Sequence, residues 1–298
     1  MPAMASFTSI SIIYNPNSTG SGKQMAEELR EELKKLMPKA SVEMVKTKRP
    51  RHGQELAYKL AKASKRALVI SASGDGGYHD VINGLLKAQA EGATPVASLI
   101  PAGNANDHFH NVHEGDLAKA IKRDEVRKLD VLKLKSTVDG KPFERYAHSY
   151  IGLGLTPAVG EELNKVDLNW FNQAWIVLKT LFFLQPVTLS LDGRRRRFDS
   201  VIFSNVTRMS KVLQISKTAE QTDGKFEVTL FKRSSKWRLI VTLLRASTTG
   251  LAGAQKTDKY EFETIKEVLV QLDGEIFTLD PKSPVTVTLE SELLRCII

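Results

Sequence analysis

The segment "SASGDGGYHDVINGLL", residues 71–86, places an aspartate among small residues where an apolar run ends. Glycines let the backbone approach a ligand closely and adopt positive φ values that other residues avoid. A carboxylate held in such a turn can orient or deprotonate an attacking hydroxyl group. The segment therefore predicts a site at Asp75, although an ordinary Asp-Gly turn explains the same spacing equally well.

The segment "YNPNSTGSGK", residues 14–23, resembles a phosphate-binding loop at first sight. The P-loop signature needs an opening glycine and a closing serine or threonine that reaches Mg²⁺. Asn17 stands at the first of these positions and Gln24 at the last, which argues against Walker A chemistry. A polar turn between a strand and a helix N-terminus can still hold an anion through backbone amides and the helix dipole.

The elements that must position these turns alternate between strand and helix over the first 130 residues. Strands are predicted at 9–15, 41–47, 66–73 and 95–103, and helices at 23–36, 53–65 and 76–90. Such alternation indicates βαβ units and a parallel sheet. Open sheets of this kind bind ligands at the carboxyl ends of their strands. Three polar turns fall there, at 15–22, 73–77 and 101–107.

After about Val131 the pattern changes to short β-like runs with Gly, Pro and Asp between them, which indicates antiparallel strands. These runs lie at 129–136, 144–155, 186–193, 197–206, 225–232, 267–279 and 284–291. A helix with Trp170, Phe171, Trp175, Phe182 and Phe183 is expected at 168–185, too short and polar to predict a membrane span. It could line an acyl pocket or touch a bilayer, or simply pack on the strands.

Composition narrows the class of protein. The 298 residues are 42% hydrophobic and 26% charged, which is ordinary for a globular chain, and the length suits two domains. Cys296 is the only cysteine, so no disulfide or cysteine zinc cluster can form within the chain, and no signal peptide is apparent, which favours the cytoplasm. The net charge of +9 favours an anionic partner, and the run Arg194–Arg197 would suit anionic headgroups. No nucleic-acid-binding signature accompanies it.

The segment "HFHNVH" brings His108, His110 and His113 close together in sequence. On a helix only His110 and His113 would share a face, and no cysteine or carboxylate set joins them. We therefore expect these histidines to be surface or site-lining residues and assign no metal to them.

Four segments together resemble the catalytic-domain superfamily of the diacylglycerol kinases and sphingosine kinases. "SGDGGYHDVINGLL" resembles its G-G-D-G segment, "IPAGNAND" its P-x-G-T-x-N-D segment, "YNPNSTGSGK" its opening N-P-x-S-G turn and "VQLDGEIF" its late D-G-E motif. They occur in the family's order over nearly the whole chain. The resemblance implies a doubly wound α/β nucleotide-binding domain at 1–132, rejoined by 284–298, and an antiparallel β-sandwich lipid-substrate domain at 133–283. The active site would lie in the cleft between them.

The same resemblance assigns roles to residues and implies ATP and Mg²⁺ as cofactors. Asp75, Asp273 and Glu275 would lie beside the γ-phosphate, and either Asp75 or Glu275 would be the general base. Contacts with ATP are implied for Asn15, Pro16, Asn17, Ser18, Thr19, Thr47, Ser73, Gly74, Asp75, Gly76, Gly77, Tyr78, His79, Gly103, Asn104, Asn106 and Asp107.

Three positions depart from the family's pattern. Gly77 and Asn104 each replace a threonine, which removes a hydroxyl near the expected nucleotide. Thr218 occupies the place of an aspartate that carries a structural Mg²⁺ in some bacterial members, so the ligands of any metal are left undetermined.

The expected function is a lipid kinase that phosphorylates diacylglycerol or a related lipid at an anionic membrane surface, peripheral to the membrane on the cytoplasmic side. A NAD kinase-like enzyme and a catalytically weakened nucleotide- or lipid-binding protein are the alternatives. No nucleic acid is expected as a partner, and a homodimer is left open.

Overall fold

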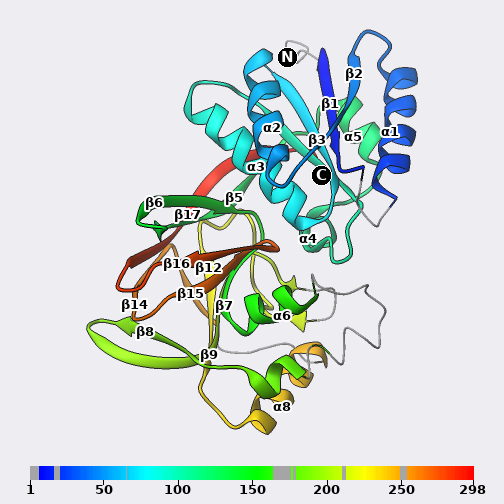
Figure 1. Ribbon diagram of the computed structural model, residues 1–298. Helices are drawn as coiled ribbons and strands as arrows, with labels where there is room; N and C mark the ends of the chain where they lie inside the picture. The colour runs from blue at the N-terminus through cyan, green and yellow to red at the C-terminus, as the bar shows by residue number, and fades with distance from the viewer. Residues whose placement is uncertain are drawn as a thin grey trace. The chain divides into compact units, whose positions relative to one another are not determined.

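The computed structural model describes residues 7–16, 21–64, 66–163, 176, 179–209, 213–248 and 254–298. The chain forms two compact units, which are described separately. The first comprises Met1–Asp130 and Ser291–Ile298, and the second comprises Val131–Glu290. The sequence-based domain bounds were 132 and 284, so the structure places the first boundary two residues earlier and the second seven residues later. Figure 1 shows the α/β character of the first unit and the strand-rich second unit.

The first unit is built on a parallel sheet whose strands are short, apolar and buried. β1 (Ser9–Tyr14) pairs with β2 (Ser41–Lys46) on one side and β3 (Ala67–Ser73) on the other, and β3 pairs with β4 (Val96–Pro101). All three pairings are parallel. β3 is buried over six consecutive residues because helices cover both faces of the sheet.

Five helices of this unit lie between or after the strands: α1 (Gly22–Leu36), α2 (His52–Ala63), α3 (Asp75–Ala90), α4 (Asp107–Val112) and α5 (Leu117–Arg123). Leu29 and Leu33 of α1 and Ile121 of α5 pack with Ile10 and Ile70 in one apolar cluster. α2 and α3 lie together on the other face of the sheet, as Figure 1 shows. The unit is therefore doubly wound, as the alternating sequence pattern predicts.

The end of β17 (Pro284–Cys296) joins this sheet as a further parallel strand. Cys296 pairs with Ala97, the Ile297 amide donates to the Ala97 carbonyl at 2.9 Å, and the Ser98 hydroxyl donates to the Ile297 carbonyl at 2.8 Å. The Cys296 thiol is buried, and burial raises its pKa to about 12. The C-terminal segment is thus a structural part of the first unit.

The second unit consists mainly of antiparallel strands. They are β5 (Arg127–Val138), β6 (Lys141–Ala147), β7 (Tyr150–Gly154), β8 (Val187–Leu191), β9 (Arg194–Ser204), β10 (Arg208–Met209), β11 (Leu213–Gln214), β12 (Phe226–Lys232), β13 (Gln255–Thr257), β14 (Lys259–Thr264), β15 (Val268–Leu272), β16 (Glu275–Leu279) and most of β17. The expected continuous run at 144–155 is interrupted at His148 and Ser149, which separate β6 from β7.

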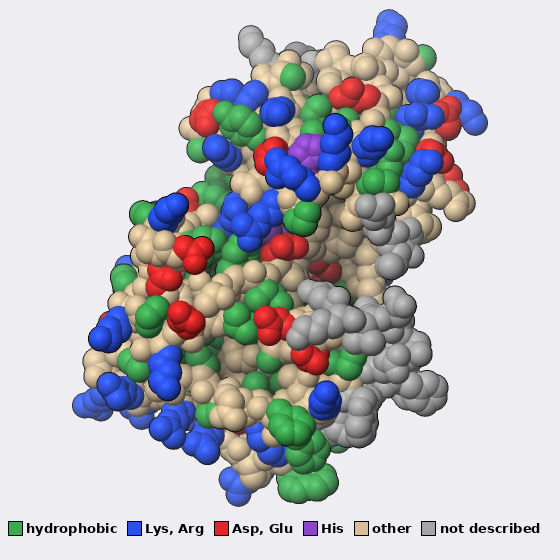
Figure 2. Space-filling model, viewed as in Figure 1, with side chains coloured by type: hydrophobic (Ala, Val, Ile, Leu, Met, Phe, Trp, Pro, Cys, Tyr) green, Lys and Arg blue, Asp and Glu red, His purple; other side chains and the backbone are tan. Residues whose placement is uncertain are grey.

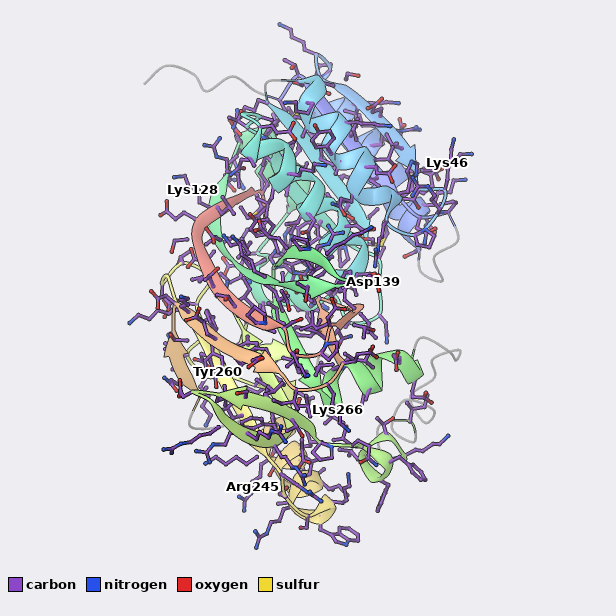
Figure 3. The ribbon with its side chains drawn as sticks, turned by 60° about the vertical axis from the view of Figure 1, so that its left-hand side comes forward. Lys46, Lys128, Asp139, Arg245, Tyr260 and Lys266 are labelled. Carbon is purple, nitrogen blue, oxygen red and sulfur yellow. The ribbon has the colours of Figure 1, made fainter. Side chains whose placement is uncertain are left out.

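The strands of the second unit enclose an apolar core on one side, and α6 and α8 pack with a second apolar cluster on the strands. Their order runs β6-β5-β17-β14-β8-β9-β7-β15-β16, with β12 also paired to β9. Phe143 of β6 packs against Phe277 of β16 at 4.9 Å between ring centroids, which brings the two ends of this path together. Phe203 of β9 lies 5.3 Å from Tyr260 of β14, and Tyr260 is labelled in Figure 3. The sheet therefore curls around its core.

Two helices of this unit are described in full, α6 (Leu155–Leu163) and α8 (Lys236–Thr248). α8 was not predicted from the sequence. The helix expected at 168–185 falls largely outside the described residues, including Trp170, Phe171 and Trp175. Residues 179–183 of it are helical. Across the described part of the chain, every helix is too short or too polar to cross a membrane.

Candidate active site

The carboxyl ends of the parallel strands lie level with one another and gather the predicted loops. Tyr14 of β1 is in register with Lys46 of β2, and Ser73 of β3 is in register with Pro101 of β4. The Thr47 amide donates to the Tyr14 carbonyl at 2.9 Å, which places Thr47 beside the start of the β1 loop. Figure 3 labels Lys46 at this end of β2. Asn15 and Pro16 follow at the surface, whereas Asn17, Ser18 and Thr19 lie outside the described residues.

The loops after β3 and β4 touch through two glycines. A Cβ atom on Gly103 would lie 2.2 Å from the Gly74 Cα atom, and one on Gly74 would lie 3.0 Å from the Gly103 Cα atom. The backbones pack against each other with no room for side chains. Two of the expected nucleotide-contacting turns are therefore one structural feature, formed by segments about thirty residues apart.

The N-terminus of α3 offers backbone amides at this edge of the sheet. Gly74 is the N-cap residue and provides no side-chain cap, and Tyr78 is the first residue whose amide bonds to a carbonyl one turn back, that of Gly74. The three amides before Tyr78 have no such carbonyl within the helix. Amides at a helix N-terminus, together with its dipole, favour an anion such as a phosphate. Gly77 is exposed, so the last of the three amides is on an accessible part of the turn.

The Asp75 carboxylate is engaged by a different helix. Its Oδ2 accepts from the Asp107 amide at 3.0 Å and its Oδ1 from the His108 amide at 3.1 Å, so Asp75 caps the N-terminus of α4. Asn106 adopts the left-handed conformation with φ of 53°, and its side chain bonds to both the amide and the carbonyl of Gly103 at 2.9 Å. Asp75, Asn106 and Asp107 thus fix the geometry of the "GNAND" turn.

Ser73 occupies the space beside Gly77. A Cβ atom at Gly77 would lie 2.5 Å from the Ser73 Oγ atom, closer than any real contact allows. The Ser73 hydroxyl also lies 2.7 Å from the Ser71 hydroxyl. Gly77 lacks the hydroxyl that a threonine would carry there. The Ser73 hydroxyl, four residues earlier, lies where the side chain of residue 77 would begin.

Several residues expected to contact ATP do not offer their side chains. Tyr78 is fully buried, and His79 and Asp107 are 2% and 3% exposed. Gly103 and Asn104 are exposed, while Asn106 is buried. For the buried residues only a backbone contact with a nucleotide is compatible with the geometry.

The histidine segment corrects one expectation. His108 is buried and its ring lies 5.1 Å from that of Tyr78, so it is not a surface residue. His113 stacks on Phe109 at 4.2 Å, and burial lowers the pKa of its ring. No cluster of three or more His, Cys, Asp or Glu side chains suitable for a metal ion occurs among the described residues.

The late D-G-E motif lies in the second unit and forms the turn between β15 and β16. Asp273 and Gly274 have φ values of 49° and 102°, and Leu272 pairs with Glu275 across the turn. Positive φ at both central residues is typical of a type I′ hairpin. The sequence Asp-Gly is among the pairs that this turn favours.

The Asp273 carboxylate is fully buried and accepts three backbone amides. These come from His148 at 2.7 Å, Ser149 at 2.9 Å and Tyr150 at 3.1 Å, and the His148 ring lies 3.4 Å from the same carboxylate. Contact with a phosphate or Mg²⁺ would require some of these bonds to break. The catalytic role expected for Asp273 stays a prediction, and the geometry favours a role in positioning the β6–β7 connection.

Glu275 differs from its neighbour. It is half-buried at the start of β16, and within the described part of the chain no hydrogen bond or ion pair engages its carboxylate. Thr218 donates its hydroxyl to the buried Glu227 at 2.7 Å, so the position matched to a metal-binding aspartate holds a hydrogen bond between side chains instead. If Mg²⁺ is bound, the described residues offer it single carboxylates such as that of Glu275, and the nucleotide phosphates would have to supply the other ligands.

Comparison with known proteins agrees with this geometry. Residues 9–134 match the model of the diacylglycerol kinase catalytic domain. Sphingosine kinase B of Dictyostelium discoideum is 33% identical over 129 residues, which are 41% of this chain and 16% of that protein. The chain therefore matches about a sixth of the length of that relative.

Solved structures share the fold at low sequence identity. A diacylglycerol kinase from Bacillus anthracis str. Sterne superposes with a TM-score of 0.72 and 18% identity, covering 99% of this chain and 98% of its own. The yeast NADH kinase complexed with NADH gives a TM-score of 0.53 and 11% identity, covering 99% of this chain and 84% of its own. The expected fold class, an α/β domain followed by an antiparallel β domain, is confirmed.

The chain has the fold of the solved diacylglycerol kinase and NADH kinase structures. Residues 9–134 are thus similar to the diacylglycerol kinase catalytic domain, and 129 residues of the chain are similar to a sphingosine kinase.

Proposed function

We propose that this protein is an ATP- and Mg²⁺-dependent lipid kinase that transfers the γ-phosphoryl group to a lipid hydroxyl, with diacylglycerol or a related lipid as acceptor. The observation that carries the proposal is the N-terminus of α3, whose amides lie at the carboxyl edge of the parallel sheet beside Gly103. It occurs within residues 9–134, which match the model of the diacylglycerol kinase catalytic domain.

The nucleotide would be held mainly by backbone. Phosphoryl transfer depends on positioning and on stabilisation of charge, so amides of a glycine turn and a few carboxylates suffice. Gly76 and Gly77 would contact phosphate oxygens, and Thr47 and Asn15 lie at the neighbouring strand ends. The enzyme would be peripheral to a membrane on the cytoplasmic side, where it would meet its lipid acceptor.

Glu275 is the better candidate for the general base. A lipid hydroxyl is a poor nucleophile until a carboxylate accepts its proton. Both Asp75 oxygens already accept amides of α4, whereas the Glu275 carboxylate has no partner among the described residues. Mg²⁺ bound with the nucleotide would neutralise phosphate charge.

The test is incubation of the purified protein with labelled ATP and Mg²⁺ against a panel of acceptors in mixed micelles. The panel contains diacylglycerol, monoacylglycerol, sphingosine and ceramide, with NAD in a separate reaction. Phosphorylation of one lipid, abolished by EDTA and absent from a Glu275→Gln preparation, is the expected result. The Glu267→Gln variant, at an exposed glutamate before β15, is the matched control for a contaminating kinase.

Two outcomes would replace this proposal. Formation of NADP at a rate comparable with any lipid product would assign the chain to the NAD kinases, whose fold it shares. Binding of ATP with no transfer to any acceptor would identify a nucleotide-binding protein without kinase activity, for which Gly77 and Asn104 supply the reason.

A further inference from the structure

The outer face of α8 presents large apolar side chains to solvent. Trp237, Val241 and Leu244 are 73%, 46% and 61% exposed and follow one another at helical spacing on one face. On the opposite face, Leu239 and Ala246 are buried against the strands. The helix is therefore apolar on two sides, and among the described residues packing within the unit explains only the side of Leu239.

The same surface continues onto the segment before β8. Phe182 and Phe183 are 51% and 74% exposed, and the buried Leu181 and Leu184 lie in one cluster with Leu239 of α8. The Lys236 ammonium donates to the Leu184 carbonyl at 2.8 Å, which ties the two segments together. Figure 2 shows hydrophobic side chains gathered at the lower end of the view, where α8 lies in Figure 1.

The charge along the segment that carries this face has one sign. From Val228 to Thr257 the sequence contains six Lys and Arg residues and no Asp or Glu. Arg238 and Arg245 are exposed on α8 itself, and Figure 3 labels Arg245 there. The Arg233 amide donates to the Arg197 carbonyl at 3.4 Å, so the exposed arginine run of β9 adjoins the start of the helix. A large apolar face bordered by cations is typical of helices that lie in a bilayer interface.

We propose that α8, together with Phe182 and Phe183, is a membrane-docking surface that inserts Trp237, Val241 and Leu244 into an anionic bilayer. Arg238, Arg245 and the arginines of β9 bind its headgroups. Charge complementarity selects this partner, because anionic lipid attracts a cationic border, and a tryptophan and phenylalanines suit the interface between headgroups and acyl chains. The inference deepens the proposed lipid kinase function by naming the surface on which the enzyme would meet its acceptor.

The experiment measures binding of the full chain to vesicles by flotation. Vesicles of phosphatidylcholine alone are compared with vesicles that contain one quarter phosphatidylglycerol. Trp237→Ala/Leu244→Ala should lower partitioning to the anionic vesicles by roughly a hundredfold, about tenfold for each large side chain removed. Arg238→Gln/Arg245→Gln should lower it by about tenfold and reduce its dependence on salt.

Matched controls test whether the loss of binding is specific to α8 or follows from removing any exposed leucine or arginine. Leu230→Ala removes an exposed leucine of β12 that lies outside α8, and Arg123→Gln/Arg127→Gln removes two exposed arginines of the first unit. Both controls should bind as the wild type does. In a Trp170→Phe/Trp175→Phe background Trp237 is the only tryptophan, and its fluorescence should be quenched by lipids brominated on the acyl chains.

Failure of this inference differs from failure of the proposed function. Equal vesicle binding by wild type and the α8 variants, with lipid kinase activity intact, would overturn the docking surface alone. Vesicle binding that requires α8 in a protein that phosphorylates no lipid would uphold the surface and refute the kinase. A wild-type dimer that the Trp237→Ala/Leu244→Ala change dissociates, with no vesicle binding, would overturn the proposal in favour of a second copy of the chain.

Discussion

Asp75 in the first unit and Asp273 in the second both use their carboxylates to hold the backbone of a distant segment. Asp75 accepts two amides at the start of α4, and Asp273 accepts three amides from His148 to Tyr150. Asp75 is half-buried beside the α3 amides, whereas Asp273 is fully buried within a hairpin turn. An acid in a motif expected to be catalytic can therefore act by holding the backbone of the site in place.

Glu275 is the counterexample two residues away. The type I′ turn turns the Asp273 side chain inward and begins β16 with a glutamate whose carboxylate has no partner among the residues described. One motif thus contains an acid committed to structure and an acid available for chemistry. Substitutions at the three acids should separate these roles.

The largest effect is expected for Glu275→Gln on turnover. Loss of a general base lowers rates by roughly two to four orders of magnitude, and the missing carboxylate affects the transition state more than nucleotide binding. Measured on the identified lipid, kcat should fall by that amount with the melting temperature unchanged. Turnover within threefold of wild type would make Glu275 a turn residue and leave the base unassigned.

The second effect is expected for Asp273→Asn on stability. An amide side chain cannot accept all three backbone amides, so buried donors lose their partners, at a cost of about 3 kcal/mol. A protein of this size should then melt roughly 6–12 °C lower. Asp280→Asn is the control, because Asp280 is half-buried and, among the described residues, its carboxylate accepts two amides, those of Asp139 and Gly140. Equal shifts in both variants would contradict the distinction drawn from burial.

A smaller effect is expected for Asp75→Asn, which leaves one accepting oxygen in place of two and so costs less than the roughly 1 kcal/mol of a whole helix cap. Hydrogen exchange of the Asp107 and His108 amides should accelerate, since their acceptor is weakened. Asp116 caps α5 by accepting the Lys119 amide at an exposed site. Asp116→Asn should therefore leave the exchange rates of the Asp107 and His108 amides unchanged. If amide exchange at Asp107 and His108 were unaltered and turnover were lost, Asp75 would act directly in the reaction.

The sequence predicts the first unit well because its strands and helices have clear periodicities. β3 is a continuous apolar run, and each polar turn follows a strand end. The contacts of Asp75 and Asp273 could not be predicted, because they join residues 32 and about 125 positions apart and involve backbone amides, which carry no sequence signal. His108 was expected at the surface or lining the site, and nothing in its own segment shows that its ring packs beside Tyr78.

The second unit is less predictable from local pattern. α8 was missed even though Leu239, Leu243 and Ala246 repeat at helical spacing, because the apolar residues of its outer face obscure the amphipathic pattern. The Ser73 and Gly77 relation was missed for a different reason. The family motif was compared with this chain one position at a time. The space beside Gly77 is filled by Ser73, the residue before the N-cap, and a comparison by position does not show this.

The smallest effect concerns the space in the first unit that Ser73 fills beside Gly77. Gly77→Ala places a Cβ atom 2.5 Å from the Ser73 hydroxyl, and this crowding should outweigh the better helix propensity of alanine, for a net cost of about 1 kcal/mol. Ser73→Gly should remove the clash, so the double variant should recover that stability.

A double-mutant cycle with thermal unfolding measures the coupling, expected at about 1–2 kcal/mol, as for residues in direct contact. ATP affinity supplies a second measurement. Ser73→Gly/Gly77→Thr restores a hydroxyl at residue 77 and removes the one at residue 73. If Ser73 compensates for Gly77, this variant should bind ATP as tightly as the wild type does. Additive effects on stability would show that the two residues act independently. Ser73 would then not compensate for the threonine hydroxyl that Gly77 lacks.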